Sequence, residues 1–351
     1  MFDILTGMSE TVALYRKYRP TKFSEVRDQD HIVTVLEGAI KKDTIPHALL
    51  FCGSRGTGKT TLARIFATEI GTADVDLYEI DAASNRGIDD IRELREAVHT
   101  MPYESKRKVY IIDEVHMLTK EAFNALLKTL EEPPAHVVFI LATTEEEKLL
   151  DTILSRCQVF KFRCPSRAVL SSTVQDIAKA EKFELSKAAA DLIAVAADGS
   201  FRDALGVTQK VILASGDEIG DADEVAAIIG APRTTLLMAV VAALHQKDVE
   251  KGLEAVATAT AEHVEMKLFV RLLLERVRAV MLIRNLPAKK EELLAHFNEE
   301  ESELIAGYAA EATTPLNSHL LVRLLTVAEQ TSRTQLPYLP LEIALVEACE
   351  K

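Results

Sequence analysis

The chain has 351 residues, of which 48% are hydrophobic and 27% are charged. This length and composition are typical of a soluble protein with two or three domains, each able to bury its own core. No stretch approaches the roughly 18 consecutive apolar residues of a membrane-spanning helix, which excludes that class of protein. The net charge of −13 argues against a protein that grips DNA with its whole surface, so any contact with nucleic acid is expected to be local.

Signals for export and for metal binding are missing from the sequence. Residues 1–7 include an acidic residue where a signal peptide needs positive charge, and no long apolar core follows them. We therefore expect a cytoplasmic protein that makes no contact with a membrane. The four cysteines show no Cys-x-x-Cys spacing, which predicts neither a zinc site nor a disulfide framework.

Short apolar runs alternate with amphipathic helical stretches in the first half of the chain. Four of these runs are predicted strands, at residues 48–51, 77–80, 109–112 and 137–142. Strands separated by helices indicate a parallel sheet with crossover helices, and runs without polar alternation indicate that helices cover both faces. The expected fold class is α/β.

After residue 165 the predicted strands end and the pattern becomes helical. Helices are predicted at residues 169–180, 186–197, 201–214, 267–283 and 316–331. Pro232 breaks the helix before it, so we expect a domain boundary there. The predicted organisation is a nucleotide-binding domain over 1–165, a small helical domain over 166–231 and a helical C-terminal domain over 232–351.

A glycine-rich loop follows the first predicted strand and leads into a helical stretch. Residues 53–60, Gly-Ser-Arg-Gly-Thr-Gly-Lys-Thr, form a P-loop pattern in this strand-to-helix setting. The backbone N–H groups of such a loop turn toward phosphate oxygens at a helix N-terminus. We expect Lys59 to bridge the β- and γ-phosphates and the Thr60 hydroxyl to ligate Mg²⁺. A glycine turn beside an exposed lysine is the alternative, which leaves the flanking strand and helix unexplained.

Two acidic residues directly follow the predicted strand at 109–112. Asp113 is placed to hold the Mg²⁺ shell, and Glu114 is placed to orient or deprotonate the attacking water. Such a strand end is a weak signal by itself, because it also fits a solvated acidic turn. It becomes a strong signal after a P-loop, since hydrolysis needs both parts.

Several segments occur together in a specific order. They lie at residues 15–20 (YRKYRP), 79–84 (EIDAAS), 113–118 (DEVHML), 123–134 (FNALLKTLEEPP), 141–144 (LATT), 154–157 (LSRC) and 199–205 (GSFRDAL). These segments resemble the gamma/tau subunits of bacterial DNA polymerase III, the AAA+ ATPases of the sliding-clamp loader. The resemblance implies a AAA+ P-loop NTPase domain, a helical lid domain and an all-helical collar domain for oligomerisation, with ATP and Mg²⁺ as cofactors and DNA replication as the process.

The resemblance also implies roles for residues around the nucleotide. Arg156 is implied to be an arginine finger that enters the ATP site of a neighbouring subunit, and Arg202 to be a sensor 2 arginine at its own site. Thr144 is implied to be the sensor 1 residue near Glu114. Without the resemblance, Arg156 also fits a helix cap and Arg202 an ion pair with Asp203. The implied nucleotide contacts are Arg19, Pro20 and Val26 near the adenine, and Gly53, Ser54, Arg55, Gly56, Thr57, Gly58, Lys59, Thr60, Thr61 and Arg202 near the phosphates.

DNA contacts are implied at a few positions. Arg92, Lys128 and Lys148 match positions that touch DNA phosphates, with Thr119 as a hydroxyl donor. Phosphate contacts position DNA without reading bases, which suits a protein that accepts any primer site. Each of these residues also fits an ordinary solvated helix position. The implied partners are delta- and delta-prime-type subunits, copies of this chain, the sliding clamp and primed DNA.

The sequence departs from the family pattern at two places. Family members commonly carry a four-cysteine zinc module between the P-loop helix and the next strand, whereas residues 70–78 pass directly into that strand, so we expect no zinc. Asp28 stands where a glycine is usual, which leaves the local turn in doubt. The chain also lacks the long tail of tau-type forms, which predicts a gamma-like extent.

Other functions share parts of these motifs. A branch-migration motor or another hexameric AAA+ remodeller shares the P-loop, Glu114 and both arginines, and a small subunit of replication factor C is closer still. The segments at 127–133 and 155–157 disfavour the remodeller, and the segment at 79–84 follows bacterial usage. A non-catalytic subunit of the delta-prime type keeps the fold, but the intact Lys59, Thr60, Asp113 and Glu114 argue against it.

Overall fold

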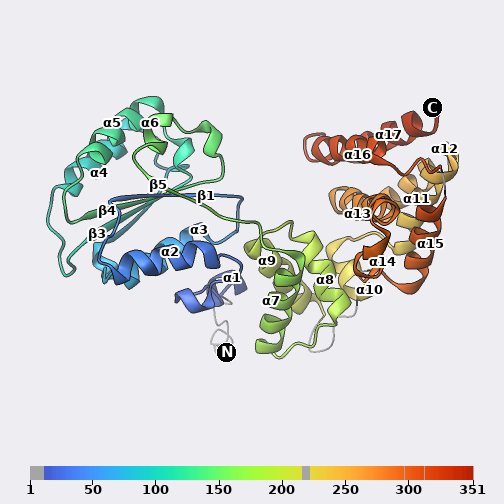
Figure 1. The fold of residues 1–351 in the computed structure, drawn as a ribbon, viewed down its shortest axis with the longest axis horizontal. Coiled ribbons are helices and arrows are strands. Elements are labelled where there is room, and N and C mark those ends of the chain that lie inside the picture. Colours follow the sequence, from blue (N-terminus) through green and yellow to red (C-terminus); the bar gives the residue numbers. More distant parts are fainter. Residues whose placement is uncertain (1–11, 216–221, 296, 312, 351) are drawn as a thin grey trace, which may run out of the picture. The chain divides into compact units, whose positions relative to one another are not determined.

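The computed structural model describes residues 12–215, 222–295, 297–311 and 313–350. The chain divides into two compact units, whose elements are labelled in Figure 1. One unit consists of the described residues up to Lys182 together with Ala197–Gln209, and the other of Phe183–Ala196 with the described residues from Lys210 onward. The predicted boundaries after residues 165 and 231 are a different division and stay a prediction. The segment at 1–7, where no signal peptide is expected, lies outside the described residues.

The first unit contains a five-stranded parallel sheet with the strand order β2-β3-β4-β1-β5. Its strands are β1 (Ala48–Cys52), β2 (Leu77–Asp81), β3 (Lys108–Asp113), β4 (Val137–Thr143) and β5 (Gln158–Lys161). The first four agree with the predicted strands to within one residue at each end. β5 was not predicted, because it is a short edge strand in which only Phe160 is buried.

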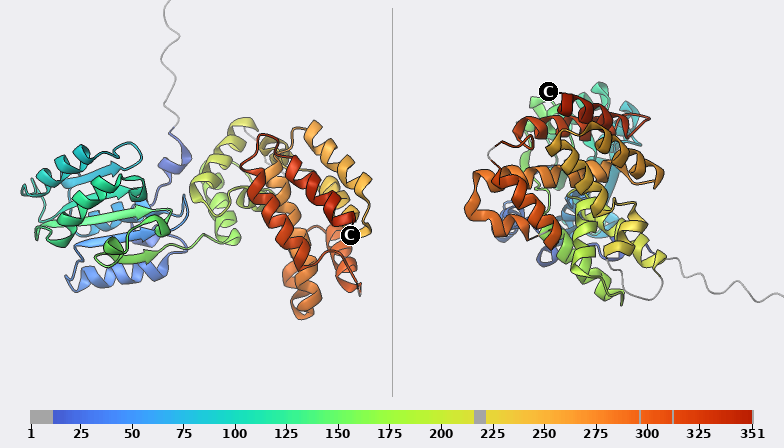
Figure 2. Two further views of the ribbon diagram at one scale, coloured as in Figure 1. Left: turned by 90° about the horizontal axis from the view of Figure 1, so that it is seen from above. Right: turned by 90° about the vertical axis from the view of Figure 1, so that its right-hand side faces the viewer.

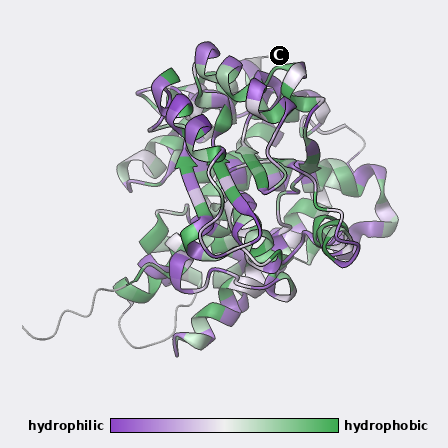
Figure 3. Ribbon diagram, turned by 90° about the vertical axis from the view of Figure 1, so that its left-hand side faces the viewer, coloured by the Kyte–Doolittle hydropathy of each residue, from purple (hydrophilic) through white to green (hydrophobic). Residues whose placement is uncertain are grey.

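Successive strand residues point to opposite faces of the sheet, and each face has its own core. Leu50 of β1 packs on the face covered by α4 (Ile88–Val98), α5 (Lys120–Glu131) and α6 (Asp151–Leu154). Its neighbours Leu49 and Phe51 pack on the face covered by α2 (Asp30–Lys41) and α3 (Lys59–Glu69). Figures 1 and 2 show the sheet between these two helical layers, and Figure 3 shows hydrophobic and hydrophilic residues alternating along the helices. Both faces are buried, as the apolar runs predict.

The first unit also contains α1 (Leu14–Lys17), α7 (Arg167–Ala180) and the start of α9 (Phe201–Ala214).

The two residues before α2 form hydrogen bonds with the segment that follows β5. The Gln29 side chain donates to the carbonyl oxygen of Arg163 at 2.8 Å and accepts from its N–H at 3.1 Å. Asp28 adopts φ = 61° and accepts from the N–H of Ser166 at 2.9 Å. The left-handed turn is thus formed without glycine, because aspartate tolerates this conformation better than most residues.

The second unit is built of helices around α13 (Met266–Asn285). Its other helices are α8 (Lys187–Ala196), α10 (Ala222–Ile229), α11 (Thr234–Gln246), α12 (Val249–Ala261), α14 (Lys290–Leu294), α15 (Glu299–Ala310), α16 (Ser318–Thr331) and α17 (Leu339–Glu350). α13 buries Phe269, Leu273 and Val277, and packs against α11, α15 and α16. Arg276 and Glu301 form a buried ion pair in the same core. Among the described residues, none of the helices combines the length and the apolar character needed to cross a membrane.

A buried carboxylate fixes the short link between α3 and β2. Asp76 is fully buried and accepts hydrogen bonds at 2.7–2.9 Å from the backbone N–H groups of Tyr103, Glu104 and Ser105. Burial by itself raises the pKa of Asp76, but these hydrogen bonds outweigh it and lower the pKa to about 2. The charged form of Asp76 therefore stabilises the fold.

We predict that Asp76→Asn lowers the free energy of unfolding by about 1–3 kcal/mol at neutral pH, because the amide presents N–H groups to backbone donors. The folded-state pKa lies below the unfolded value of 3.8, so the wild-type advantage is present above about pH 4 and is lost as the pH falls toward 2. Urea unfolding at several pH values measures this difference. The exposed Asp74→Asn is the control, and equal stability of Asp76→Asn and wild type at neutral pH would contradict the prediction.

Candidate nucleotide-binding and hydrolysis site

The glycine-rich loop between β1 and α3 adopts a backbone conformation that requires glycine. Gly56 and Gly58 have φ values of 74° and 101°, in the left-handed region. A side chain on Gly56 would also collide with Ser200, since its Cβ would lie 2.0 Å from Oγ. Phe201 N–H donates to the carbonyl oxygen of Gly56 at 3.0 Å. The loop conformation therefore depends on the start of α9 as well as on β1.

Lys59, the first residue of α3, is buried with its ammonium group inside this loop. Its Nζ donates to the carbonyl oxygens of Gly53 at 2.7 Å and Ser54 at 2.9 Å. Burial lowers the pKa of Lys59, while the carboxylates of Glu114 and Asp113 oppose this shift. The amine is thus held where a P-loop lysine meets phosphate oxygens.

Thr60 and Asp113 meet although they are far apart in the sequence. Thr60 Oγ1 donates to Asp113 Oδ2 at 2.7 Å. A hydroxyl and a carboxylate are oxygen ligands that Mg²⁺ accepts, and this ion usually completes its shell with phosphate oxygens and water. The pair therefore fits the predicted Mg²⁺ ligands. The expectation that the protein lacks zinc stays a prediction.

Glu114 and Thr144 follow neighbouring strands, β3 and β4, and contact each other. Thr144 Oγ1 donates to Glu114 Oε2 at 3.0 Å. Glu114 has φ = 49°, which is uncommon for a residue with a side chain, and its N–H donates to Asp113 Oδ1 at 3.0 Å. The structure thus brings the predicted base and the predicted sensor 1 residue together.

Two cavities with shared walls open beside these residues. One, of about 1040 Å³, has a charged lining that includes Arg55, Lys59, Thr60, Asp113, Glu114 and Arg202. The other, of about 780 Å³, has a lining that includes Pro20, Val26, Thr57, Ile177, Phe201 and Leu205. They share Arg19, Gly58 and Thr61, among others. The first has the chemistry to hold phosphates and the second to hold a base, so together they fit a nucleotide.

Three of the predicted arginines, Arg19, Arg55 and Arg202, line these cavities. The Arg202 guanidinium, on α9, lies 5.8 Å from the ring centroid of Tyr15, within the range of a cation–π contact. Arg19 Nε donates to Thr61 Oγ1 at 3.0 Å, and burial lowers the pKa of Arg19. The structure therefore places the Arg19 and Arg202 side chains beside the P-loop. Tyr15 belongs to the segment at 15–20, but its contact with Arg202 was not predicted.

Arg156, the predicted arginine finger, lies just after α6 and outside the lining of both cavities. Its Nη2 lies 2.6 Å from Glu131 Oε1, and its Nη1 donates to the carbonyl oxygen of Thr152 at 2.7 Å. About a third of the side chain is exposed. This position fits a residue that acts on a neighbouring subunit.

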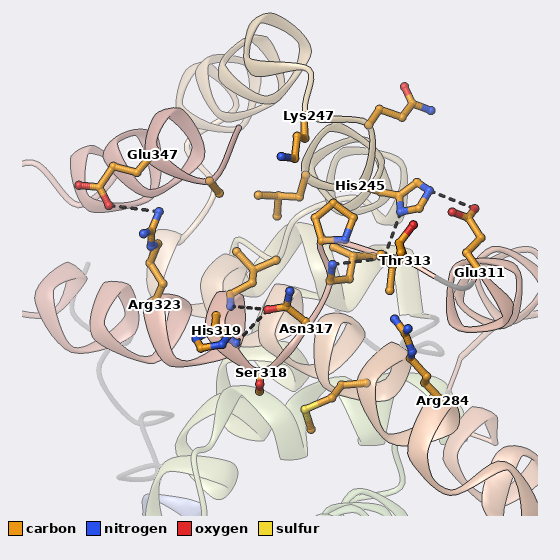
Figure 4. A pocket seen from close by; sticks show the side chains of 18 of the residues that line it. His245, Lys247, Arg284, Glu311, Thr313, Asn317, Ser318, His319, Arg323 and Glu347 are labelled. Carbon is orange, nitrogen blue, oxygen red and sulfur yellow. Dashed lines mark hydrogen bonds and ion pairs between the residues drawn. The ribbon is translucent and has the colours of Figure 1, made fainter. Parts of the chain in front are cut away.

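A further cavity, of about 1000 Å³, lies in the second unit (Figure 4). Its charged side chains include His245 and Glu311, which lie 3.1 Å apart, and Arg323 and Glu347, which lie 3.2 Å apart. Asn317 accepts hydrogen bonds from two backbone N–H groups at the start of α16. None of the predicted site residues lines this cavity, so it is separate from the candidate site.

Known proteins resemble the chain over most of its length. A family model described as DNA polymerase III, delta subunit matches residues 71–166, and one described as DNA polymerase III clamp loader subunit, ATPase lid domain matches residues 170–217. DNA polymerase III subunit tau of Bacillus subtilis is 36% identical over 96% of this chain, and that of Escherichia coli is 35% identical over 93%. The chain belongs to the gamma/tau family of DNA polymerase III subunits. It spans 63% and 53% of the length of these two relatives.

Solved structures with the same fold include the RuvB Holliday junction branch migration motor of Thermotoga maritima. The TM-score is 0.52, with 21% identity, over 71% of this chain and 86% of that chain. This likeness, the parallel sheet and the lid-domain match confirm the predicted AAA+ fold of this gamma/tau family member.

The four residues implied to contact DNA lie on α4, on α5 and in the segment after β4. Arg92 and Lys148 each pair with an acidic residue three positions earlier, at 2.9 Å and 2.5 Å. Thr119 Oγ1 accepts from a backbone N–H at 3.3 Å and caps α5, which carries Lys128. The capping role of Thr119 was not predicted, and DNA contact stays a prediction for all four residues.

His116, a polar neighbour of Glu114, and Glu145, which contacts His116, were not predicted from the sequence. His116 and Glu145 contact each other at 3.2 Å, and His116 also lies 3.5 Å from Glu114. His116 is part of the DEVHML segment by which the gamma/tau family was recognised, but that segment does not reveal which side chains meet it. Glu145 follows Thr144 directly, and only the adjacency of β3 and β4 brings it to His116.

We predict that Lys59→Ala weakens ATP binding by about 10- to 150-fold, because a hydrogen bond to a charged group contributes about 1.5–3 kcal/mol. Isothermal titration calorimetry with ATP measures the change, and the melting temperature checks that the variant is folded. Lys41→Ala is the control, since Lys41 is exposed and pairs only weakly, at 3.8 Å, with Glu37. Undiminished ATP affinity in Lys59→Ala would count against the P-loop assignment.

Proposed function

We propose that this chain is the ATPase motor subunit of a DNA polymerase III clamp loader. In this proposal it binds and hydrolyses ATP to open a sliding clamp and load it onto primed DNA. The observation that carries the proposal is the meeting of Lys59, Thr60, Asp113 and Glu114 beside one cavity in a member of the gamma/tau family. The match to a clamp-loader lid domain supports the same process.

ATP binds across the two connected cavities. Its base lies beside Pro20 and Val26, and its phosphates lie against the N–H groups of the P-loop and the amine of Lys59. Thr60 and Asp113 would hold Mg²⁺, which would neutralise negative charge on the phosphates. Arg202 adds a positive charge from α9.

Glu114 acts as the general base in this reaction. A water oxygen bonds to the γ-phosphorus, the bond from this phosphorus to the β–γ bridging oxygen breaks, and the water proton passes to the Glu114 carboxylate. The hydrogen bond from Thr144 holds one carboxylate oxygen and thereby orients the side chain. The products are ADP and phosphate.

Arg156 acts on the ATP of a neighbouring subunit. Its position outside the cavities of its own chain supports this role, and the Ser-Arg-Cys motif of the family supports it further. In an assembly, Arg156 exchanges its contact with Glu131 for the phosphates of the neighbouring ATP. An arginine supplied in this way accelerates hydrolysis by about 10³–10⁵-fold, so the isolated chain hydrolyses ATP slowly.

The proposed partners are delta- and delta-prime-type subunits, copies of this chain, the sliding clamp and primed DNA, in the bacterial cytoplasm. The proposed DNA contacts are Arg92, Lys128, Lys148 and Thr119. A few positive charges from each of several subunits follow a DNA duplex even though each chain is acidic. Such contacts go to phosphates and accept any sequence.

A different AAA+ DNA-remodelling ATPase, or a subunit like the small subunits of replication factor C, is the alternative function. The likeness to RuvB supports it only at the level of the fold, at 21% identity. The 35–36% identity to DNA polymerase III subunits and the clamp-loader lid match favour the loader. Native mass spectrometry with delta-type subunits separates the two, since the loader forms a mixed open assembly and the remodeller forms a closed ring of identical chains.

We predict that Glu114→Gln keeps ATP affinity and lowers kcat by about 10²–10⁴-fold, because the amide has the shape of the carboxylate without its basicity. Steady-state phosphate release by the assembled loader, with clamp and primed DNA present, measures kcat. The exposed Glu147→Gln is the matched control. Wild-type turnover in Glu114→Gln would exclude Glu114 as the base.

We predict that Arg156→Ala and Lys59→Ala complement each other in mixed assemblies. Each variant lacks a different half of the composite site, so some interfaces in a mixture join an intact P-loop to an intact Arg156. ATPase activity of separate and mixed assemblies measures this, and activity is expected to return only in the mixture. Free Arg156→Ala is expected to bind ATP normally. Loss of ATP binding by the free variant, or an inactive mixture in which mixed assemblies form, would show that Arg156 acts within its own chain.

A further inference from the structure

The His116 ring is buried directly beside the proposed base. His116 lies in the short 3-10 helix Val115–Met117, which follows Glu114, and its side chain is 5% exposed. Its Nε2 lies 3.2 Å from Glu145 Oε1, and its Nδ1 lies 3.0 Å from Thr143 Oγ1 and 3.5 Å from Glu114 Oε2. The ring therefore lies between two carboxylates.

Glu145 continues these contacts to the surface. Its other oxygen, Oε2, lies 2.5 Å from the Nζ of Lys148, whose side chain is 57% exposed. Hydrogen bonding to Lys148 lowers the pKa of Glu145, so its carboxylate is charged near neutral pH. A continuous path of polar contacts thus runs from exposed Lys148 through Glu145 and His116 to Glu114.

These contacts decide which nitrogen of the neutral ring carries the proton. A carboxylate only accepts hydrogen bonds, so Nε2–H donates to Glu145 and Nδ1 is an acceptor. The Thr143 hydroxyl donates to Nδ1, and its oxygen accepts from the N–H of Glu145 at 3.0 Å. Glu114 Oε2, which accepts a hydrogen bond from Thr144, lies 3.5 Å from Nδ1, so the ring packs against this oxygen without donating a hydrogen bond to it. The ring and Thr144 together limit where the Glu114 carboxylate lies.

We propose that His116 is a positioning residue for Glu114 and that Glu145 couples it to Lys148, so that a DNA phosphate bound at Lys148 changes the rate of ATP hydrolysis. The inference rests on the proposed function, which supplies both Glu114 as the base and DNA as the ligand. A phosphate group competes with Glu145 for the ammonium group of Lys148. When the phosphate binds, the charge of Glu145 acts on His116 without a neighbouring cation. The His116 ring itself is buried and contacts Glu145 directly, so the hydrogen bond at Nδ1 and the packing of the ring on Glu114 respond to this change.

The test measures kcat and KM for ATP of the loader assembled from the full chain with delta- and delta-prime-type subunits, without and with saturating primed DNA. His116→Ala removes both ring contacts, whereas the shorter amide of His116→Asn keeps a polar group near Nδ1 but does not reach Glu145. We expect both variants to lose the DNA-dependent change in kcat and to keep the wild-type KM. We also expect His116→Asn to recover part of the DNA-free kcat that His116→Ala loses.

A change in the middle of the path tests whether the groups act together. Glu145→Gln keeps an oxygen for the Nε2–H of His116 but removes the charge that attracts Lys148. We expect it to reduce the DNA-dependent change in kcat, and we expect no further reduction when it is added to His116→Asn, because both changes interrupt one path. Lys161→Ala is the matched control. Lys161 lies 3.1 Å from Glu146 in a neighbouring lysine–glutamate ion pair, and this pair lies outside the path.

The outcomes separate this inference from the proposed function. A wild-type DNA response in His116→Asn overturns the inference, as does a wild-type assembly that hydrolyses ATP without responding to DNA; both leave the ATPase proposal standing. A raised KM together with a lower melting temperature in both His116 variants assigns His116 to the fold alone and also overturns the inference. An assembly of wild-type chains that fails to hydrolyse ATP overturns the proposed function itself.

Discussion

The adjacency of β3, β4 and β1 in a parallel sheet is the constraint on which the site depends. Parallel strands place their carboxyl ends at one edge of the sheet, and there the register pairs Cys52 with Thr143 and Ile112 with Leu141. The P-loop follows β1, the acidic pair ends β3 and Thr144 follows β4, so all three meet at this edge. A slip of one strand by one residue would move each of its side chains to the opposite face of the sheet and would separate these groups. Because both faces carry a buried core, such a slip would disrupt the packing, and the cores therefore stabilise this register.

The lining of the charged cavity holds more basic than acidic residues, although the whole chain is acidic. The net charge is −13, yet the charged cavity of about 1040 Å³ is lined by six basic residues, Arg16, Arg19, Arg55, Lys59, Arg64 and Arg202, against four acidic ones. A concave site focuses this positive potential on an anionic ligand, while the acidic remainder discourages unspecific binding of polyanions. Burial also lowers the pKa of Lys59, which a bound triphosphate would offset by favouring the charged amine.

Glu114 is the residue at which the strand edge, the cavity and the His116 path meet. Its left-handed backbone conformation costs on the order of 1–3 kcal/mol. Such strain persists only when surrounding contacts hold the residue in place. Here β3, the hydrogen bond to Asp113 and the contact with Thr144 supply those restraints. A carboxylate held by several weak contacts responds to a change in any of them, which is the physical basis of the proposed coupling at Glu114.

The sequence by itself determined the features that are contiguous in the chain. Apolar runs predicted β1 to β4, and the glycine spacing ending in Lys59 and Thr60 predicted the P-loop. The roles of Arg156 and Arg202 needed the family resemblance, and β5 escaped because an edge strand with one buried residue leaves no long apolar run. Only the tertiary structure decided which other distant groups meet, such as His116 with Thr143 and Glu145. The physical reason is that alternating burial specifies the two faces of a strand, whereas these contacts depend on which strand lies beside it and in what register.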